Sequence, residues 1–101
     1  MATYVLLSTL APDAVKDPGE FAKLAETVAN KIKSECPNVR WKDSYAVMGR
    51  LDVVDIVEAD DPADVAKAAM IIRCYGHATT ETMQAIAWKE FVAKASAGKK
   101  R

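Results

Sequence analysis

A short phrase that occurs twice in the chain constrains its fold more than any other feature. DPGEFAKLA at 17–25 and DPADVAKAA at 61–69 share an aspartate, a proline directly after it, and an acidic residue three positions after the aspartate. This arrangement is typical of a helix start, where Asp caps free N–H groups, Pro takes the first helical position and the acid reaches back toward the cap. Two helices that begin alike, 44 residues apart, indicate two similar halves related by an internal pseudo-twofold.

Strand patterns surround the two helix starts. β-branched and apolar residues dominate 3–10, 39–48 and 51–59, and a threonine-rich alternating segment occupies 77–87. Gly49-Arg50 separates the middle two strands and suggests a tight, glycine-first turn of two residues. WKEFVAKAS at 88–96 indicates a short final helix. The order predicts an α+β, ferredoxin-like βαββαβ sandwich with an extra C-terminal helix, in which helices cover one face of a four-stranded antiparallel sheet.

Length and composition limit the chain to one domain with few classes of partner. Of the 101 residues half are hydrophobic, so we assign 1–97 to a single compact domain and 98–101, GKKR, to a short basic tail. Fourteen basic residues balance fourteen acidic ones, and the field that attracts nucleic acid is therefore missing. No apolar run approaches the ~20 residues of a membrane span, and the opening lacks the basic flank of a signal peptide. We expect a cytoplasmic protein with no nucleic-acid or membrane partner.

The strands are apolar on both faces, although helices can cover only one of them. In the first strand Tyr4, Leu6 and Leu10 point one way, while Val5 and Leu7 point the other. A face in contact with water would show polar residues at alternate positions, so another sheet is expected there, most simply from an identical chain. We predict a homodimer or a larger homo-oligomer formed through the sheet face.

Two aspartates, Asp52 and Asp55, interrupt the apolar strand at 51–59 and suggest a catalytic pair. Residues three apart in a strand point to opposite faces, so these carboxylates cannot converge on one reacting atom. Asp52 shares a face with Glu58, but six residues at ~3.3 Å per residue place them about 20 Å apart, beyond the spacing of cooperating acid and base groups. The paired-carboxylate hypothesis therefore fails within this strand.

The hairpin instead offers each aspartate a separate role. A two-residue turn places Asp55 opposite Ser44, with Lys42 on its diagonal, so we expect a structural role for Asp55. Asp52 lies beside the turn with Tyr45 on its own face, and it is the better candidate for a functional site.

The remaining candidates lie near the end of the second helix and on the second strand. His77, the only histidine, is a candidate for catalysis or ligand contact, with a helix-terminal role as the alternative. Thr79 and Glu81 share its strand face and are candidate ligand-binding residues. Trp41 and Tyr45 are predicted on one face of the second strand, where packing is the alternative to a site role. No cysteine or histidine spacing suits a metal, so neither metal nor cofactor is expected.

Several segments together resemble the GYD domain family, small bacterial and archaeal proteins of mostly unknown function. They are MATYVLLSTL, MGRLDVVDIVEADDPADVAKAAM and GHATTETMQAI, and the resemblance covers nearly the whole chain. The family is named for a G-x-Y-D pattern in the hairpin; Gly49 and Asp52 match it, but Leu51 stands where tyrosine is usual. The resemblance implies the dimeric α/β-barrel form of the ferredoxin-like fold, with two sheets packed face to face, and no established reaction.

Two classes of function remain open. In the first, the chain is a homo-oligomeric module that binds a small molecule or has a structural role, which suits the lack of a nucleophile–base pair or phosphate-binding loop in the sequence. The alternative is a cofactor-free enzyme, isomerase-like or monooxygenase-like, as some dimeric α/β-barrel relatives are. Its pocket would lie between sheet and helices and be lined by His77, Asp52 and Tyr45. The expected partners are a second copy of the chain and a small-molecule ligand.

Overall fold

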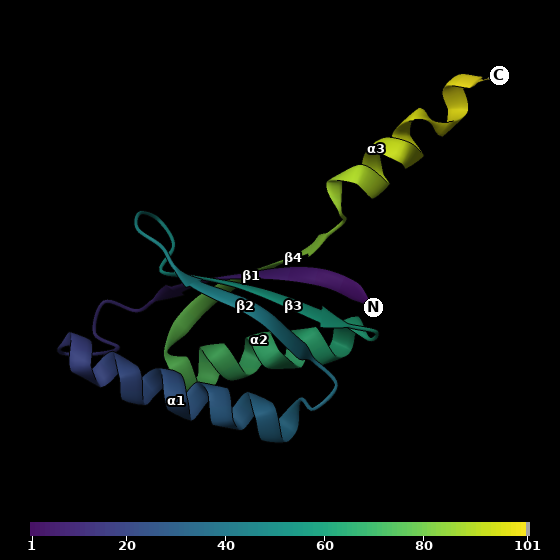
Figure 1. Cartoon of the computed structure of the whole chain (residues 1–101). Coiled ribbons are helices and arrows are strands. Elements are labelled where there is room, and N and C mark those ends of the chain that lie inside the picture. Colours follow the sequence, from purple (N-terminus) through teal and green to yellow (C-terminus); the bar gives the residue numbers. More distant parts are fainter. Residues whose placement is uncertain (101) are drawn as a thin grey trace.

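The computed structural model describes residues 1–100, and the side chains of residues 1–98. Its elements are β1 (Ala2–Leu10), α1 (Pro18–Glu35), β2 (Arg40–Ala46), β3 (Val53–Ala59), α2 (Pro62–Gly76), β4 (Ala78–Ala85), α3 (Trp88–Ser96) and the 3-10 turn η1 (Ala97–Lys100). The strands form one antiparallel sheet in the order β2-β3-β1-β4, and α1 and α2 lie side by side below it (Figure 1). The predicted ferredoxin-like α+β fold with an extra C-terminal helix is confirmed. The predicted basic tail, 98–101, lies partly outside the described residues.

Both repeated phrases form capped helix starts, as predicted. Asp17 Oδ1 accepts a hydrogen bond from the Glu20 N–H at 3.0 Å, and Asp61 Oδ1 accepts one from the Ala63 N–H at 2.8 Å. Proline occupies the start of each helix. The Glu20 carboxylate reaches back past the cap residue and accepts the Lys16 N–H. The local chemistry of the two phrases therefore sets where α1 and α2 begin.

The core lies mainly between the sheet and α2. The buried hydrophobic residues come from β1, β3, α2 and the end of α1: Tyr4, Leu6, Ile32, Cys36, Val57, Ala59, Val65, Ala68, Ala69, Ile71 and Ile72. Within α1 only Ile32 is buried, while Phe21, Leu24 and Val28 of the same stripe are half-exposed. The first part of α1 therefore does not pack tightly against the sheet.

The hairpin of β2 and β3 has the predicted register near its tip but a wider turn. Ser44 pairs with Asp55, and the last backbone hydrogen bond runs from the Val47 N–H to the Asp52 carbonyl at 2.9 Å. Residues 48–51 then form the connection, so the predicted two-residue turn at Gly49-Arg50 was wrong.

A β-bulge between Trp41 and Asp43 shifts the register of β2. Trp41 pairs with Val57, a core residue on the face covered by the helices, whereas Tyr45 pairs with Val54 on the opposite face. The prediction that Trp41 and Tyr45 share a face was therefore wrong, because the extra residue reverses the alternation between them.

The last helix, α3, projects away from the sheet and from the other two helices (Figure 1). It buries none of its residues, and Trp88 and Phe91 are 75% and 49% exposed. The described part of the chain extends over 60 × 30 × 17 Å as a result. None of the helices described is both long and apolar enough to cross a membrane.

Candidate functional site

A cleft of about 650 Å³ opens between α1 and the sheet. Its walls are mainly apolar, with Phe21, Leu24 and Val28 of α1 on one side and Leu10 and Val53 of the sheet on the other. The volume is in the range of small-molecule binding sites, roughly 300–1,000 Å³. The half-exposed stripe of α1 is therefore the wall of a cleft.

Asp55 lies on the sheet side of this cleft and is buried, with 7% of its surface exposed. Its Oδ1 accepts hydrogen bonds from the Ser44 hydroxyl at 2.5 Å and from Trp41 Nε1 at 3.1 Å. The expected partner Ser44 is confirmed, whereas Lys42, the other expected partner, lies 4.0 Å from Glu58 instead. The Trp41 contact was missed because no residue type in β2 marks the bulge that turns the indole toward Asp55.

Ser8 of β1 also lines the cleft and is buried, with 4% of its surface exposed. Its hydroxyl has no hydrogen-bond partner among the residues that the structure describes. Sequence reasoning missed Ser8, because a serine in a strand gives no signal of its own; the only hint was that it shares a face with Leu6. A buried hydroxyl without a partner is unusual and costs folding free energy.

Asp52 lines neither of the two cavities described here; backbone groups bind it instead. Its Oδ2 accepts the Leu10 N–H at 2.7 Å, its own N–H donates to the Ser8 carbonyl at 2.9 Å, and its carbonyl accepts the Val47 N–H at 2.9 Å. The residue thus joins the end of β1 to the tip of the hairpin through both its backbone and its side chain.

His77 follows the last residue of α2 and is exposed, in the left-handed conformation with φ 51°. Its carbonyl accepts the Ala11 N–H at 2.9 Å. His77 and Thr79 line a second, shallow depression of about 470 Å³ together with Arg73 and Asp13. This depression lies apart from Asp55 and Ser8, which line the first cleft only.

The other predicted site residues are spread over the sheet. Glu81 lies on β4 and forms an ion pair with Arg50 of the hairpin connection at 3.7 Å. Tyr45 lies at the margin of the first cleft on the edge strand β2. Among the described residues, no hydrogen bond joins His77, Asp52 and Tyr45, and the three lie in different surroundings.

Neither cysteine is in a disulfide. Cys36 lines the cleft and is buried, and burial raises the pKa of its thiol, while Cys74 is exposed. Over the part of the chain that the structure describes, no group of three His, Cys, Asp or Glu residues is placed to hold a metal ion.

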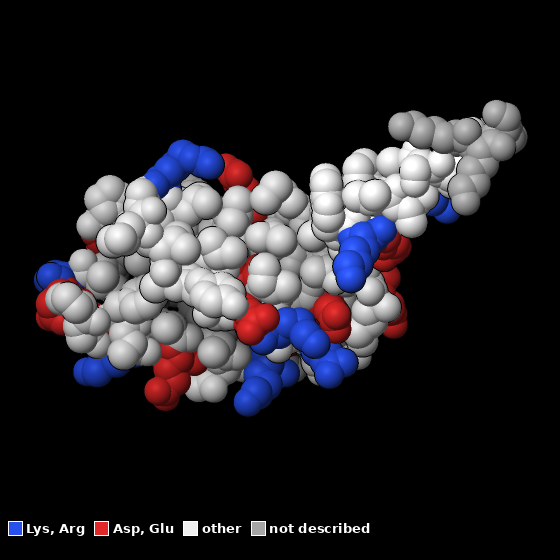
Figure 2. All heavy atoms as spheres, turned by 45° about the horizontal axis from the view of Figure 1, so that its top comes forward, with Lys and Arg blue, Asp and Glu red and all other residues white. Residues whose placement is uncertain are grey.

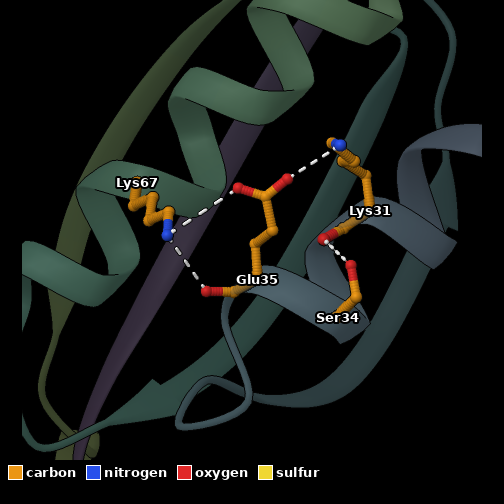
Figure 3. Close-up of polar contacts among 4 residues, drawn as sticks. All are labelled: Lys31, Ser34, Glu35 and Lys67. Carbon is orange, nitrogen blue, oxygen red and sulfur yellow. Dashed lines mark hydrogen bonds and ion pairs between the residues drawn. The ribbon is translucent and has the colours of Figure 1, made fainter.

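An ion pair and a hydrogen bond, both from Lys67, attach the C-terminal end of α1 to α2 (Figure 3). Glu35 accepts from Lys31 at 2.9 Å on the same helix, and Lys67 of α2 lies 3.8 Å from the Glu35 carboxylate and donates to its carbonyl at 3.2 Å. The hydrogen bond from Lys31 lowers the pKa of Glu35, and the same bond raises the pKa of Lys31. Lys31 also lies over the Tyr75 ring, 5.1 Å from its centre. One end of α1 is thus fixed while the other borders the cleft.

The sequence model of the GYD domain matches residues 4–95. The chain belongs to the GYD domain family. It is 33% identical over 98 residues to the "Glutamine synthetase and cystathionine beta-lyase binding protein" of Thermus thermophilus. That alignment covers 93% of this chain and 98% of the relative, and the resemblance noted from the sequence is confirmed.

Two solved structures are similar to this GYD domain. The crystal structure of FFRP-DM1 has a TM-score of 0.54 and 27% identity, and the match covers 85% of this chain and 100% of the other. The hypothetical protein PHS023 from Pyrococcus horikoshii has a TM-score of 0.52 and 27% identity, with coverage of 85% and 90%. Both likenesses agree with the fold described above.

Two residues of the GYD hairpin pattern have clear local roles in this chain. Gly49 has φ 115°, a conformation that residues with a side chain rarely adopt. Asp52 binds the Leu10 N–H. Leu51, in place of the usual tyrosine, is half-buried and offers no hydroxyl. The pattern here shapes the hairpin and fastens it to the end of β1.

Proposed function

We propose that this GYD domain is a homo-oligomeric binding module, which covers the outer face of its sheet with a second copy and binds other proteins. The outer face is the side of the sheet away from α1 and α2. Its apolar residues come from all four strands: Val5, Leu7, Tyr45, Val54, Ile56 and Met83. Figure 2 shows a broad uncharged area over the sheet, with charged side chains around its margin. This uncovered apolar face is the observation on which the proposal rests.

A second copy suits the outer face better than water does. Tyr45 and Met83 are 56% and 48% exposed, and they flank a band of half-buried valine and isoleucine. Monomeric proteins rarely expose contiguous apolar patches of this kind, and a twofold pairing would cover each patch with the other. The ion pair of Arg50 with Glu81 lies toward the margin, where charges remain hydrated.

Binding of other proteins is supported by the relative from Thermus thermophilus. Its name states that it binds glutamine synthetase and cystathionine beta-lyase, and this chain aligns with nearly all of it. The projecting α3 offers a surface for such partners, because Trp88, Phe91 and Val92 are exposed on it. Amphipathic helices commonly bind by placing their apolar side in a partner's groove.

The arrangement of the predicted catalytic residues favours binding over catalysis. Asp52 is bound to the Leu10 N–H, His77 borders the shallow depression, and Tyr45 lies at the margin of the first cleft. A shared reaction would need these groups within a few ångströms of one substrate atom.

The oligomer is tested with Ile56→Lys at the centre of the outer face. A lysine there meets Asp43 across the strands, so the monomer keeps its fold, while the charge opposes a face-to-face partner. Light scattering at micromolar concentration should give at least a dimer of the 11.0 kDa chain for the wild type and a monomer for the variant. Ala66→Glu, on the exposed side of α2, should not change the mass. A monomeric wild type would overturn the proposal.

Protein binding is tested with purified glutamine synthetase and cystathionine beta-lyase from the same source as the chain. We expect an immobilised wild-type chain to retain at least one of them in surface plasmon resonance. The double variant Trp88→Ala, Phe91→Ala should bind at least tenfold more weakly, because it removes the exposed aromatic pair of α3. Equal binding by the two forms would rule out α3 as the contact surface.

A further inference from the structure

We propose that the cleft between α1 and the sheet binds a small, mainly apolar molecule that bears a protonated amine, with Asp55 and Ser8 as the residues that hold the amine. Both residues line the cleft, and both are more than nine-tenths buried. Asp55 comes from β3 and Ser8 from the neighbouring strand β1, and Val53 pairs with Ser8 two residues before Asp55. The two polar side chains therefore lie close together on one face of the sheet.

The polar atoms of this pair are incompletely satisfied by the protein. Asp55 Oδ1 accepts two hydrogen bonds, but in the described part of the chain Oδ2 accepts none, and Asp55 takes part in no ion pair. The Ser8 hydroxyl has no partner at all within the same residues. A buried hydroxyl is normally paired, because leaving it unpaired costs free energy, and among the described residues Ser8 Oγ is the one buried side-chain polar atom without a partner. Asp55 Oδ2 is therefore accessible and free to accept a hydrogen bond. A ligand that donates hydrogen bonds to both would offset that cost.

The charges of the cleft select the class of ligand. Asp55 is the one acidic side chain among the lining residues, and Lys33, exposed on α1, is the one basic side chain. A cation is attracted to Asp55 and repelled by Lys33, so the amine points to the sheet and the apolar body lies along Phe21, Leu24 and Val28. An anionic ligand would meet the buried carboxylate and is disfavoured.

This site and the proposed oligomer lie on opposite faces of the sheet. The side chains of Ser8 and Asp55 point to the helix-covered face, whereas those of Val5 and Ile56 point to the outer face. The two proposals can therefore fail separately, and neither experiment depends on the other.

The test uses Trp41, whose indole donates to Asp55, as a fluorescent reporter. Trp88→Phe on the projecting α3 leaves Trp41 as the one tryptophan, and n-octylamine and n-octanoate serve as probes of equal length and opposite charge. We expect n-octylamine to change the Trp41 emission saturably and to bind at least tenfold more tightly than n-octanoate. Asp55→Asn should weaken n-octylamine binding at least tenfold, and Asp43→Asn, an exposed carboxylate outside the cleft, should leave it unchanged.

Two further variants keep the result decisive where Asp55→Asn destabilises the fold. Ala29→Phe on α1 fills the cleft from its wall and should abolish binding with little change in melting temperature. Ser8→Ala should weaken binding severalfold with an unchanged or higher melting temperature, since it removes an unpaired buried hydroxyl. Equal affinity for the two probes, retained binding in Ala29→Phe, or no saturable signal with n-octylamine would overturn the proposal.

Discussion

At the scale of single residues, Asp52 illustrates how a carboxylate directly before an apolar strand serves the fold. We expect Asp52→Ala to lower the free energy of unfolding by about 1.5–3 kcal/mol, because a charged acceptor is lost and the Leu10 N–H is left without its partner. Asp52→Asn keeps an oxygen in place and should cost roughly half as much. Urea denaturation followed by circular dichroism measures both values.

A matched control separates this bond from a general effect of charge. Glu26→Ala also removes a carboxylate, but Glu26 is exposed on α1, so its effect should stay within about 0.5 kcal/mol. If Asp52→Ala cost no more than this control, the bond to Leu10 would contribute nothing to stability.

His77 is a second residue whose backbone leads to a prediction. Its φ of 51° is easily adopted by glycine but strained for a residue with a side chain. His77→Gly should therefore raise the free energy of unfolding by roughly 0.5–1 kcal/mol, as measured by urea denaturation. Cys74→Gly, at an exposed position within α2, should lower it by a similar amount. A loss of stability in His77→Gly would show that the imidazole makes a contact of its own.

The residue-scale features differ in how far the sequence could predict them. The contact of Asp55 with Ser44 was predictable, because alternation and register extend reliably over a few residues from the hairpin tip. Trp41 was placed wrongly with respect to Tyr45, since a bulge has no residue signature here. The unpaired hydroxyl of Ser8 depends on how α1 stands over the sheet, and no local pattern encodes that distance.

At the scale of elements, the attachment of α1 by its C-terminal half governs the cleft. Ile32 and Cys36 are buried at that end, and Glu35 connects to Lys67 of α2. The helix start at Asp17 was predictable because a cap is local, whereas the position of the helix over the sheet is set by these distant contacts. The hairpin turn was mispredicted for a similar reason, since Asp52 is held by β1 through its N–H and its side chain, and the chain between Val47 and Asp52 forms a four-residue connection.

The link between α1 and α2 should make stability depend on pH. The hydrogen bond from Lys31 lowers the pKa of Glu35 in the folded state, so the folded chain binds this proton more weakly than the unfolded chain. The stabilisation is present above the unfolded pKa of about 4.3 and is lost as pH falls through the lower folded pKa. We expect Glu35→Gln to lower the melting temperature at pH 7, with the difference from wild type shrinking as the pH falls below about 4.3.

Salt and a second glutamate provide the controls for this pH dependence. Glu35 is exposed enough for screening, so 1 M sodium chloride should reduce the difference between Glu35→Gln and wild type. Glu26→Gln removes an exposed glutamate of α1 that has no ion pair among the residues described, and it should follow the wild-type curve. Parallel curves for Glu35→Gln and wild type on both sides of about pH 4.3 would contradict the assignment.

At the scale of the whole molecule, two apolar surfaces lie outside the core: the outer sheet face and α3. The apolar outer face was predictable, because the alternating positions on both sides of β1 carry apolar residues. The projection of α3 was not, since the pattern of 88–96 predicts an amphipathic helix without stating what it packs against. Because α3 buries none of its residues, the described domain gains little stability from it, and its apolar side is free for another molecule.

Removing residues 88–101 tests whether α3 contributes to the stability of the domain, to the oligomer or to the binding of other proteins. We expect the shortened chain to keep its melting temperature within about 2 °C and its oligomeric mass, because the core contains no residue of α3 and the outer face is intact. If α3 makes the proposed contact, retention of glutamine synthetase or cystathionine beta-lyase should be lost, because Trp88, Phe91 and Val92 are gone. Calorimetry, light scattering and surface plasmon resonance measure the three quantities. If the same truncation in the monomeric variant Ile56→Lys lowered the melting temperature strongly, α3 would pack on its own domain. If it changed the oligomeric mass of the otherwise wild-type chain, α3 would be part of the oligomer.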